Sequence, residues 1–351
     1  MAKFHRKLPQ GAFEIGDGRA SGWLCLLIAV LCATAMLVMI FPAYLTTPEL
    51  REIYLQLPLR PILSGALWLA TGFGLFSIMK RYRTRAAFYG LILVGICLLF
   101  GGANIQTGNM KDVAVTLGVD WVIFALVIFA PAFVLIERLN PVHKDQVVLR
   151  PEWKIDMAYF IVLHLAVGGM LIITNTMVHD VFSWLRFPSL SHWLGAIHPA
   201  LQFGLLILAV DLGQYWIHRL YHENAKLWNI HEIHHSAPHM DWLAGSRLHI
   251  FEALATRTTV LLVMTAIGFG ETAINIYVVF VMVAGTFIHA NFKLELGPLE
   301  RIFVTPKLHH WHHAKEEAAI NKNYAIHLSF LDVLFGTYYN PKKWPDEYGV
   351  V

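Results

Sequence analysis

Five histidines fall within a stretch of eighteen residues, and their spacing can direct several imidazoles at one point. They are His218, His222, His231, His234 and His235. On a helix, offsets of three and four residues place side chains on one face. A second cluster, His309–His313, repeats the three-then-one offset further along the chain. Since imidazole binds iron, copper, zinc and nickel, the two clusters together predict a metal site.

The number of matched histidines indicates two metal ions. Eight imidazoles share the offsets: His218, His222, His231, His234, His235, His309, His312 and His313. Two ions with about four to five ligands each would use them, and His249 and His289 are candidates for the remaining positions. We expect His239, in a loop, and His310, which points away from its neighbours, to lie outside the site.

The ligand type limits the choice of metal. An all-nitrogen donor set argues against magnesium and calcium, which prefer oxygen. Zinc fits the ligands, but it cannot accept or donate electrons. Iron can activate dioxygen, and a membrane setting implies apolar substrates, in which oxidation takes place at unactivated C–H bonds. The sequence therefore favours two iron ions, without excluding zinc.

One short segment also matches a zinc-protease pattern. In His231-Glu232-Ile233-His234-His235, the first and last histidines would bind zinc and Glu232 would act as general base. Such a site needs only one further ligand, which would leave at least five matched histidines without a role. A zinc-dependent membrane hydrolase stays open as an alternative, as does a non-catalytic metal-binding or transport protein.

Two carboxylates accompany the first cluster and are candidate catalytic residues. Asp211 precedes His218 by seven residues and lies on the same helical face. We expect it to hydrogen-bond a ligating histidine and fix its tautomer, because ionisable groups within a span are commonly functional. Glu223 directly follows His222 and is a candidate ligand or a partner of a ligand.

The composition indicates a membrane protein. Of 351 residues, 56% are apolar and 15% are charged, against about 25% charged in soluble domains. The formal net charge of +3 and the absence of a basic tract argue against nucleic-acid binding. The three cysteines, Cys25, Cys32 and Cys97, lie in apolar runs and are interpreted as small buried hydrophobic residues.

Eight apolar runs are candidate spans, and the last two are short for a membrane crossing of about 20 residues. They are Trp23–Tyr44, Ile62–Met79, Ala87–Asn104, Leu117–Leu135, Met157–Thr176, Leu194–Trp216, Leu254–Phe269 and Ile274–His289. The predicted fold is therefore an all-α polytopic membrane protein with a helical, histidine-rich cap. The first run is expected to be a retained span and not a signal peptide.

Basic residues alternate between the connections and predict the orientation of the spans. They gather in the N-terminal tail and in two connections: Lys3, Arg6, Lys7 and Arg19; Lys80, Arg81, Arg83 and Arg85; Arg138, Lys144, Arg150 and Lys154. The positive-inside rule places these segments, and with them all the clustered histidines, in the cytoplasm. We expect the bacterial inner membrane, with residues 1–150 as a four-span accessory region and residues 151–351 as the catalytic region, whose motifs occupy residues 200–339.

With these residues in view, the chain resembles the fatty acid hydroxylase/sterol desaturase superfamily of integral-membrane di-iron enzymes. The resemblance rests on spacing: His218-x3-His222, His231-x2-His234-His235 and His309-x2-His312-His313, with Asp211, Tyr215, Arg247-Leu248-His249, Phe287–Asn291, Asp332 and Phe335-Gly336-Thr337 in support. One departure is Ile250-Phe251 after His249, where many members carry proline next. Glu223 is similar to the alkylglycerol monooxygenase branch.

The resemblance implies a fold and an activity. The expected fold is a set of transmembrane helices capped by a cytoplasmic helical bundle that holds the metals. The expected reaction is hydroxylation or desaturation of a sterol, fatty acyl chain or ether lipid. It uses O2 and two electrons from a separate redox partner, such as a ferredoxin or a cytochrome b5-like protein.

Overall fold

The structure is a computed structural model of the chain, and it describes residues 18–47, 51, 54, 56–80, 85–110, 113 and 116–350. The described residues form helices, turns and loops, with a single isolated β-bridge between Ala314 and Tyr348. The all-helical class predicted from the sequence is confirmed. Two compact units divide the chain, Met1–Ile123 and Phe124–Val351.

The first unit is a bundle of three long helices. α1 (Arg19–Ile40) packs against α4 (Leu59–Met79) and α5 (Arg85–Leu99), with the short α2 (Pro42–Leu45) and η1 (Gly102–Asn104) beside them. Cys32 and Cys97 lie in the buried core between these helices, and Cys25 is also buried and free, as predicted. Gly90 lets α5 approach α1 closely, because a Cβ there would lie 2.6 Å from the sulfur of Cys25.

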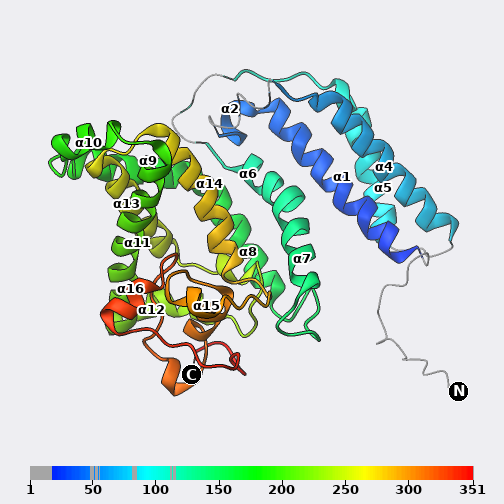
Figure 1. Cartoon of the computed structure of the whole chain (residues 1–351). Coiled ribbons are helices and arrows are strands. Elements are labelled where there is room, and N and C mark those ends of the chain that lie inside the picture. The colour runs from blue at the N-terminus through cyan, green and yellow to red at the C-terminus, as the bar shows by residue number, and fades with distance from the viewer. Residues whose placement is uncertain are drawn as a thin grey trace, which may run out of the picture. The chain divides into compact units, whose positions relative to one another are not determined.

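The second unit contains the remaining helices. They are the end of α6 (Val119–Phe124), η2 (Ala125–Phe129), α7 (Ala130–Leu139), α8 (Trp153–Leu165), α9 (Val167–Thr176), η3 (Met177–Val181), α10 (Pro188–Gly195), α11 (Pro199–Glu223), α12 (Ala225–His235), η4 (Ala244–Ser246), α13 (Ile250–Ile267), α14 (Glu271–Phe287), η5 (Gly297–Arg301), α15 (Pro306–His312), η6 (Glu317–Ala319) and α16 (Phe330–Phe335). The long α11 packs against α13 and α14, and α12, α15 and α16 gather near its C-terminal end (Figure 1).

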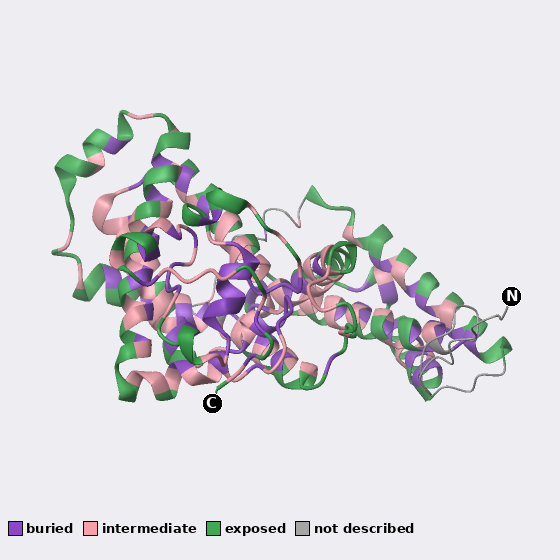
Figure 2. Ribbon diagram, turned by 60° about the horizontal axis from the view of Figure 1, so that its bottom comes forward, coloured by how far each residue is buried: buried purple, intermediate pink, exposed green. Residues whose placement is uncertain are grey.

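An apolar core joins the long helices of this unit. Leu206, Val210, Met264 and Tyr277 are buried where α11, α13 and α14 meet. The outer faces of these three helices carry exposed residues, as Figure 2 shows for much of the helical surface. Apolar side chains on an outer face are expected where the surrounding medium is lipid.

Among the described residues, six helices are long and apolar enough to cross a membrane: Ala20–Ile40, Leu59–Met79, Arg85–Asn104, Val119–Leu139, Pro199–Glu223 and Ile250–Ile267. The fifth predicted run is a broken pair, Trp153–Leu165 and Gly168–Val181, bent by 56°, which would count as a seventh span. The eighth predicted run forms the shorter apolar helix Glu271–Phe287. The chain is thus a multi-pass membrane protein. Some of the basic residues from which the orientation of the spans was predicted lie outside the described residues: Lys3, Arg6, Lys7, Arg81 and Arg83.

Candidate metal centre

Two consecutive helices carry the first histidine cluster. α11 ends at Glu223, which leaves His218 and His222 in its last two turns. Asn224 then caps α12, because its side chain accepts hydrogen bonds from the backbone N–H groups of Lys226 and Leu227. The sharp turn brings the last part of α12, with His231, His234 and His235, back beside the end of α11.

The second cluster lies on the short helix α15. A proline at its first position, Pro306, is compatible with a helix start because that N–H would be unsatisfied in any case. His309 and His312 lie on this helix, His313 follows it directly, and all three are buried. His289 follows the end of α14 and is also buried.

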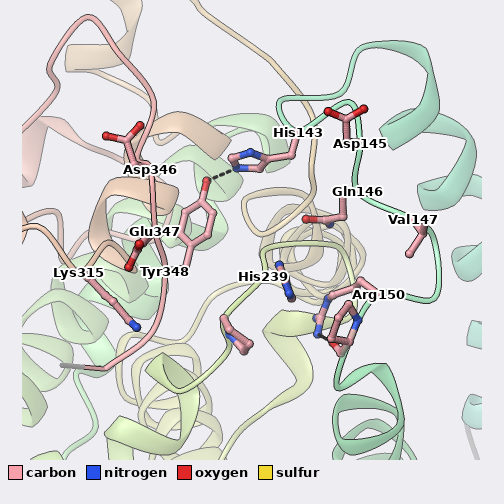
Figure 3. A pocket seen from close by; sticks show the side chains of 12 residues that line it. His143, Asp145, Gln146, Val147, Arg150, His239, Lys315, Asp346, Glu347 and Tyr348 are labelled. Carbon is pink, nitrogen blue, oxygen red and sulfur yellow. Dashed lines mark hydrogen bonds between the residues drawn. The ribbon is translucent and has the colours of Figure 1, made fainter.

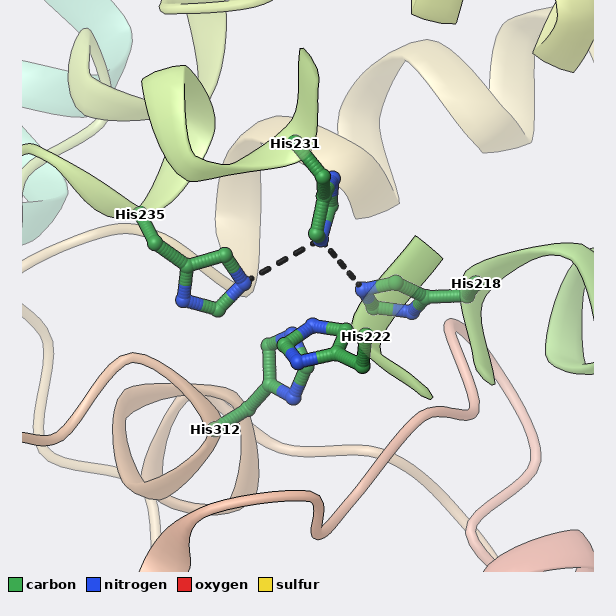
Figure 4. A group of neighbouring side chains, drawn as sticks. All are labelled: His218, His222, His231, His235 and His312. Carbon is green, nitrogen blue, oxygen red and sulfur yellow. Dashed lines mark hydrogen bonds between the residues drawn. The ribbon is translucent and has the colours of Figure 1, made fainter. Parts of the chain in front are cut away.

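The structure brings nine histidines together in two groups. The five-histidine group consists of His218, His222, His231, His235 and His312 (Figure 4). The four-histidine group consists of His234, His289, His309 and His313. In each group, the nitrogen atoms available as ligands lie within 4.8 Å of one another, and only His222 is less than fully buried. Each group could therefore hold one metal ion.

Hydrogen bonds at the far side of the imidazoles fix which nitrogen of the five-histidine group faces inward. The Nδ1 of His218 lies 2.7 Å from the carbonyl oxygen of Tyr324, and the Nδ1 of His231 lies 2.8 Å from Oε1 of Glu252. A carbonyl oxygen can only accept, so the Nδ1 of His218 carries the proton and its Nε2 carries a lone pair. The carboxylate of Glu252 assigns the same tautomer to His231.

The inward-facing Nε2 atoms of this group therefore lie close together, and these atoms carry lone pairs and no protons. The Nε2 atoms of His218 and His231 are 3.0 Å apart. The Nδ1 of His312 donates to the carbonyl of Lys322, and its buried Nε2 has no hydrogen-bond partner among the described residues. Lone pairs converging at this distance repel one another, whereas a cation between them would be coordinated by all of them. The donor set of this group therefore fits a metal ion.

The four-histidine group repeats this pattern. His234 donates from Nδ1 to the carbonyl of Arg247 and His289 donates from Nδ1 to the carbonyl of Gly285, while their Nε2 atoms lie 3.2 Å apart. Burial lowers the pKa of His289 to about 4 and holds the pKa of His234 well below its usual range. Since neither imidazole takes up an extra proton near neutral pH, both Nε2 atoms are available as ligands.

Gly245 lies directly against the four-histidine group. A Cβ at this position would lie 2.8 Å from the Nδ1 of His289 and 3.0 Å from its Cγ. Any side chain here would push the His289 ring out of place, so the close approach of the loop to the ligand requires glycine.

Asp211, which we expected to hydrogen-bond a ligating histidine, is buried and binds backbone N–H groups instead. Its carboxylate accepts the backbone N–H groups of Ile326, His327 and Leu328, the shortest at 2.6 Å from Leu328, and it contacts no histidine of either group. These bonds hold the segment that also carries the Tyr324 carbonyl, the acceptor for His218. Asp211 therefore supports the tautomer of His218 through the backbone and not by a direct hydrogen bond.

Asp332 holds the same segment from its other end. It accepts the N–H groups of Tyr324 and Ala325 at 2.7 and 3.1 Å. The sequence placed Asp332 in a supporting motif but gave it no role. The two buried carboxylates, Asp211 and Asp332, together fix the peptide units on both sides of the carbonyl that orients His218.

Two predicted site residues lie outside both groups. Glu223 pairs with Arg219 at 2.8 Å on the helix surface and is 44% exposed. His249 caps α13, accepting the N–H of Phe251 at its Nδ1. The carboxylate that does contact a grouped histidine is Glu252, which the sequence interpretation missed. Its position as an ionisable residue at the start of an apolar run was the available signal.

His310 is buried but faces away from the groups. Its Nδ1 lies 3.0 Å from the hydroxyl of Tyr348, and its Nε2 lies 3.1 Å from the carbonyl of Ala290. Tyr348 also contacts His143 at 2.8 Å, on the wall of a pocket of about 550 Å³ (Figure 3). No grouped histidine lines this pocket.

The sequence segment that contains both histidine groups was compared with known protein families. Residues 203–337 match the model of the fatty acid hydroxylase family, and this segment contains all nine grouped histidines. This part of the chain is similar to the fatty acid hydroxylase family. The resemblance predicted from the histidine spacing is thereby confirmed, and no solved structure matches the chain.

The curated relatives that the chain matches include an ornithine lipid hydroxylase and alkylglycerol monooxygenases. The chain is 31% identical over 216 residues to ornithine lipid hydroxylase OlsE of Rhizobium tropici, which covers 60% of the chain and 64% of that protein. It is 30% identical over 161 residues to alkylglycerol monooxygenase of Danio rerio (46% of the chain, 34% of that protein) and 31% identical over 131 residues to the Homo sapiens protein (37% and 29%). The chain thus spans less than two thirds of the length of each of these relatives.

Proposed function

We propose that the chain is a membrane-bound di-iron oxygenase that hydroxylates or desaturates a C–H position of a membrane lipid. The observation that carries the proposal is the convergence of nine imidazoles, eight of them buried, in two groups, with the tautomers of four ligands fixed by backbone carbonyls: His218, His312, His234 and His289. The family match and the lipid-hydroxylating relatives support the substrate class. The candidate substrates are a sterol, a fatty acyl chain and an ether lipid.

Two bound irons would supply the activation of O2 that oxidation of an unactivated C–H bond requires, with two electrons from a separate donor such as a ferredoxin or a cytochrome b5-like protein. The protein's own contribution is preorganisation. Backbone carbonyls hold the outer N–H of four ligands, and Glu252 contacts a fifth, His231. Eight of the nine imidazoles are buried, which limits the access of water to both groups. Asp211 positions the His218 acceptor, whereas Glu223 stays at the surface beside Arg219 and is proposed to affect only the rim of the site.

The two-unit division suggests how the chain is arranged in the membrane. We propose that the second unit is the catalytic region, that the first is an accessory bundle, and that the histidine groups face the cytoplasm of a bacterial cell. The five-histidine group takes His218 and His222 from the end of the candidate span Pro199–Glu223. The four-histidine group takes His289 from just beyond the shorter apolar helix Glu271–Phe287. Ligands at the ends of apolar helices support a site at the membrane surface. A lipid could then reach the metals from the bilayer without crossing water.

The zinc-hydrolase alternative finds less support in the geometry. His231 and His235 do share a group, but three further histidines, His218, His222 and His312, complete it. A catalytic zinc has three protein ligands and an open position for water, so five converging imidazoles exceed that need. The observation favours two ligand-rich sites over one hydrolytic zinc.

Lipid profiling of cells that express the wild-type chain or His234→Ala tests the proposed function. His234 is a buried member of the four-histidine group, so its loss should abolish formation of the product. In the variant, one lipid class should lack one oxygen, or be more saturated, compared with the wild type. His239→Ala, a loop substitution outside both groups, serves as the control and should match the wild type. Identical lipids in all three strains, with equal protein levels, would refute an oxygenase acting on cellular lipids.

A further inference from the structure

Oxidisable aromatic side chains border the five-histidine group and not the four-histidine group. Three such rings contact imidazoles of the five-histidine group, at shortest centroid distances of 5.1, 5.4 and 5.2 Å: Trp228, Tyr221 and Tyr324. In the described part of the chain, the imidazoles of the four-histidine group make ring contacts only with other histidines. The two groups therefore differ in how easily their surroundings can give up an electron.

Trp228 joins the five-histidine group to the protein surface. It lies seven residues before His235 on α12, which is about two helical turns, so the two side chains share one face of the helix. The indole ring lies 5.1 Å from the ring of His222 and 5.4 Å from the ring of His235, measured between centroids. Part of Trp228 is exposed, whereas Tyr221 and Tyr324 are buried. A molecule in solution can therefore reach Trp228 while Trp228 contacts two of the proposed ligands.

The proposed reaction gives an oxidisable ring beside the ligands a consequence. A site that can remove hydrogen from an unactivated C–H bond is also a strong enough oxidant to take an electron from an indole ring. When no lipid is in place, the nearest groups that can be oxidised are the imidazoles themselves and the three aromatic rings. Because the rate of electron transfer falls steeply with distance, a ring in contact with the ligands reacts before any more distant group.

Of the three rings, Trp228 is the best suited to give up an electron and to regain one. A tyrosine releases its hydroxyl proton when it is oxidised, so it needs a proton acceptor nearby, whereas an indole ring can lose an electron and keep its N–H proton. The buried hydroxyl of Tyr324 has no hydrogen-bond partner among the described residues. Tyr221 is buried, so a reductant in solution does not reach it. Trp228 needs no proton acceptor and is open to solution.

We propose that Trp228 protects the five-histidine group by giving up an electron when the site is oxidised in the absence of a lipid. The inference rests on the proposed function, which supplies the oxidant. The Trp228 ring loses one electron to the oxidised site and regains one from a soluble reductant at the surface, such as a thiol. Two such transfers replace the two electrons that a lipid C–H bond would have supplied. Two thiols become one disulfide and release two protons, the oxygen is released as water, and Trp228 is restored with no bond broken.

A purely structural role for Trp228 would be to cover the five-histidine group against water. Trp228→Phe separates the two roles, because phenylalanine keeps an aromatic ring in the same place but is not readily oxidised. Trp216 provides the matched control: it is a tryptophan of α11 that is 49% exposed. Its ring lies 5.5 Å from that of Tyr215 and, among the described residues, contacts no histidine of either group.

The test exposes the iron-loaded, chemically reduced full chain to O2 without excess reductant, in a surfactant whose fluorinated tail offers no C–H bond to oxidise. Electron paramagnetic resonance of rapidly frozen samples should show a tryptophan radical in the wild type. Peptide mass spectrometry should find oxygen added to Trp228 in preference to the more exposed Trp216. Trp228→Phe should keep the wild-type iron content, lose the radical, and gain oxygen on His222 or His235 instead. Trp216→Phe should behave as the wild type does.

Three outcomes would overturn the inference: a Trp228→Phe protein that forms the same radical, a Trp216→Phe protein that loses it, or a wild type that gains oxygen on Trp216 or Tyr324 in place of Trp228. If Trp228→Phe does not fold, Trp228→Tyr replaces it and should give a tyrosine radical, since water can take the proton at the exposed edge; a tryptophan radical in that variant also counts against the inference. The mass measurement on the wild type needs no variant.

The result also separates this inference from the proposed function. A protein that oxidises lipid but forms neither the radical nor the Trp228 adduct refutes only this inference. An iron-loaded chain that does not react with O2 refutes the proposed function, and this inference with it.

Discussion

His235→Ala is expected to remove the metal ion from the five-histidine group and to leave the four-histidine group loaded. The Nε2 of His235 lies 3.1 Å from the Nε2 of His231, and both point at the centre of the group. Changes to residues that merely support metal ligands already cost about 10- to 100-fold, so loss of a ligand should lower oxygenase activity by about 100-fold or more. Metal content should fall by about half, measured on purified protein together with lipid turnover.

The control for this prediction is His239→Ala. His239 follows His235 by four residues but lies outside both groups. It should keep the wild-type metal content and activity. If His239→Ala lost as much metal as His235→Ala, or if His235→Ala stayed fully loaded, the assignment of His235 as a ligand would be wrong.

Asp156→Asn is expected to destabilise the fold by about 3–5 kcal/mol, because it breaks a buried ionic cluster and leaves two guanidinium groups short of negative charge. Asp156 is fully buried, 2.5 Å from Arg150 and 2.5 Å from Arg247. The cluster also orders the loop whose Arg247 carbonyl accepts from His234, so metal binding by the four-histidine group should weaken as well. The free energy of unfolding in denaturant measures the first effect.

Glu152→Gln is the matched change at the edge of the same cluster. Glu152 is 41% exposed and contacts only the outer nitrogen of Arg247, at 3.0 Å. An exposed ion pair contributes about 1 kcal/mol or less. Equal destabilisation by the two isosteric variants would contradict the view that the buried Asp156 holds the cluster together.

The spans and the pairing of some ligands could be predicted from the sequence because both depend on local periodicity. Residues four apart on a helix share a face, and each such pair, His218 with His222, His231 with His235 and His309 with His313, stays within one group. Periodicity could not predict that each sequence cluster supplies ligands to both groups. His234, from the first cluster, lies in the four-histidine group, and His312, from the second cluster, lies in the five-histidine group.

The supporting residues were harder to predict because their partners are distant in sequence. Asp211 was expected to hydrogen-bond a ligating histidine, but its partners, the N–H groups of residues 326–328, lie more than a hundred positions away. Glu252 and Asp332 likewise acquire their roles only when α13 and the C-terminal loops fold onto α11 and α12. Periodicity says which face a residue occupies, but it does not say which distant backbone groups that face will meet.

The most direct test of the central claim is the metal content of the full chain purified without oxygen, measured by elemental analysis together with X-ray absorption at the iron edge. The proposed function predicts two irons per chain, each in a nitrogen-rich shell from imidazoles. One zinc per chain with no iron would contradict it and would favour the hydrolase alternative.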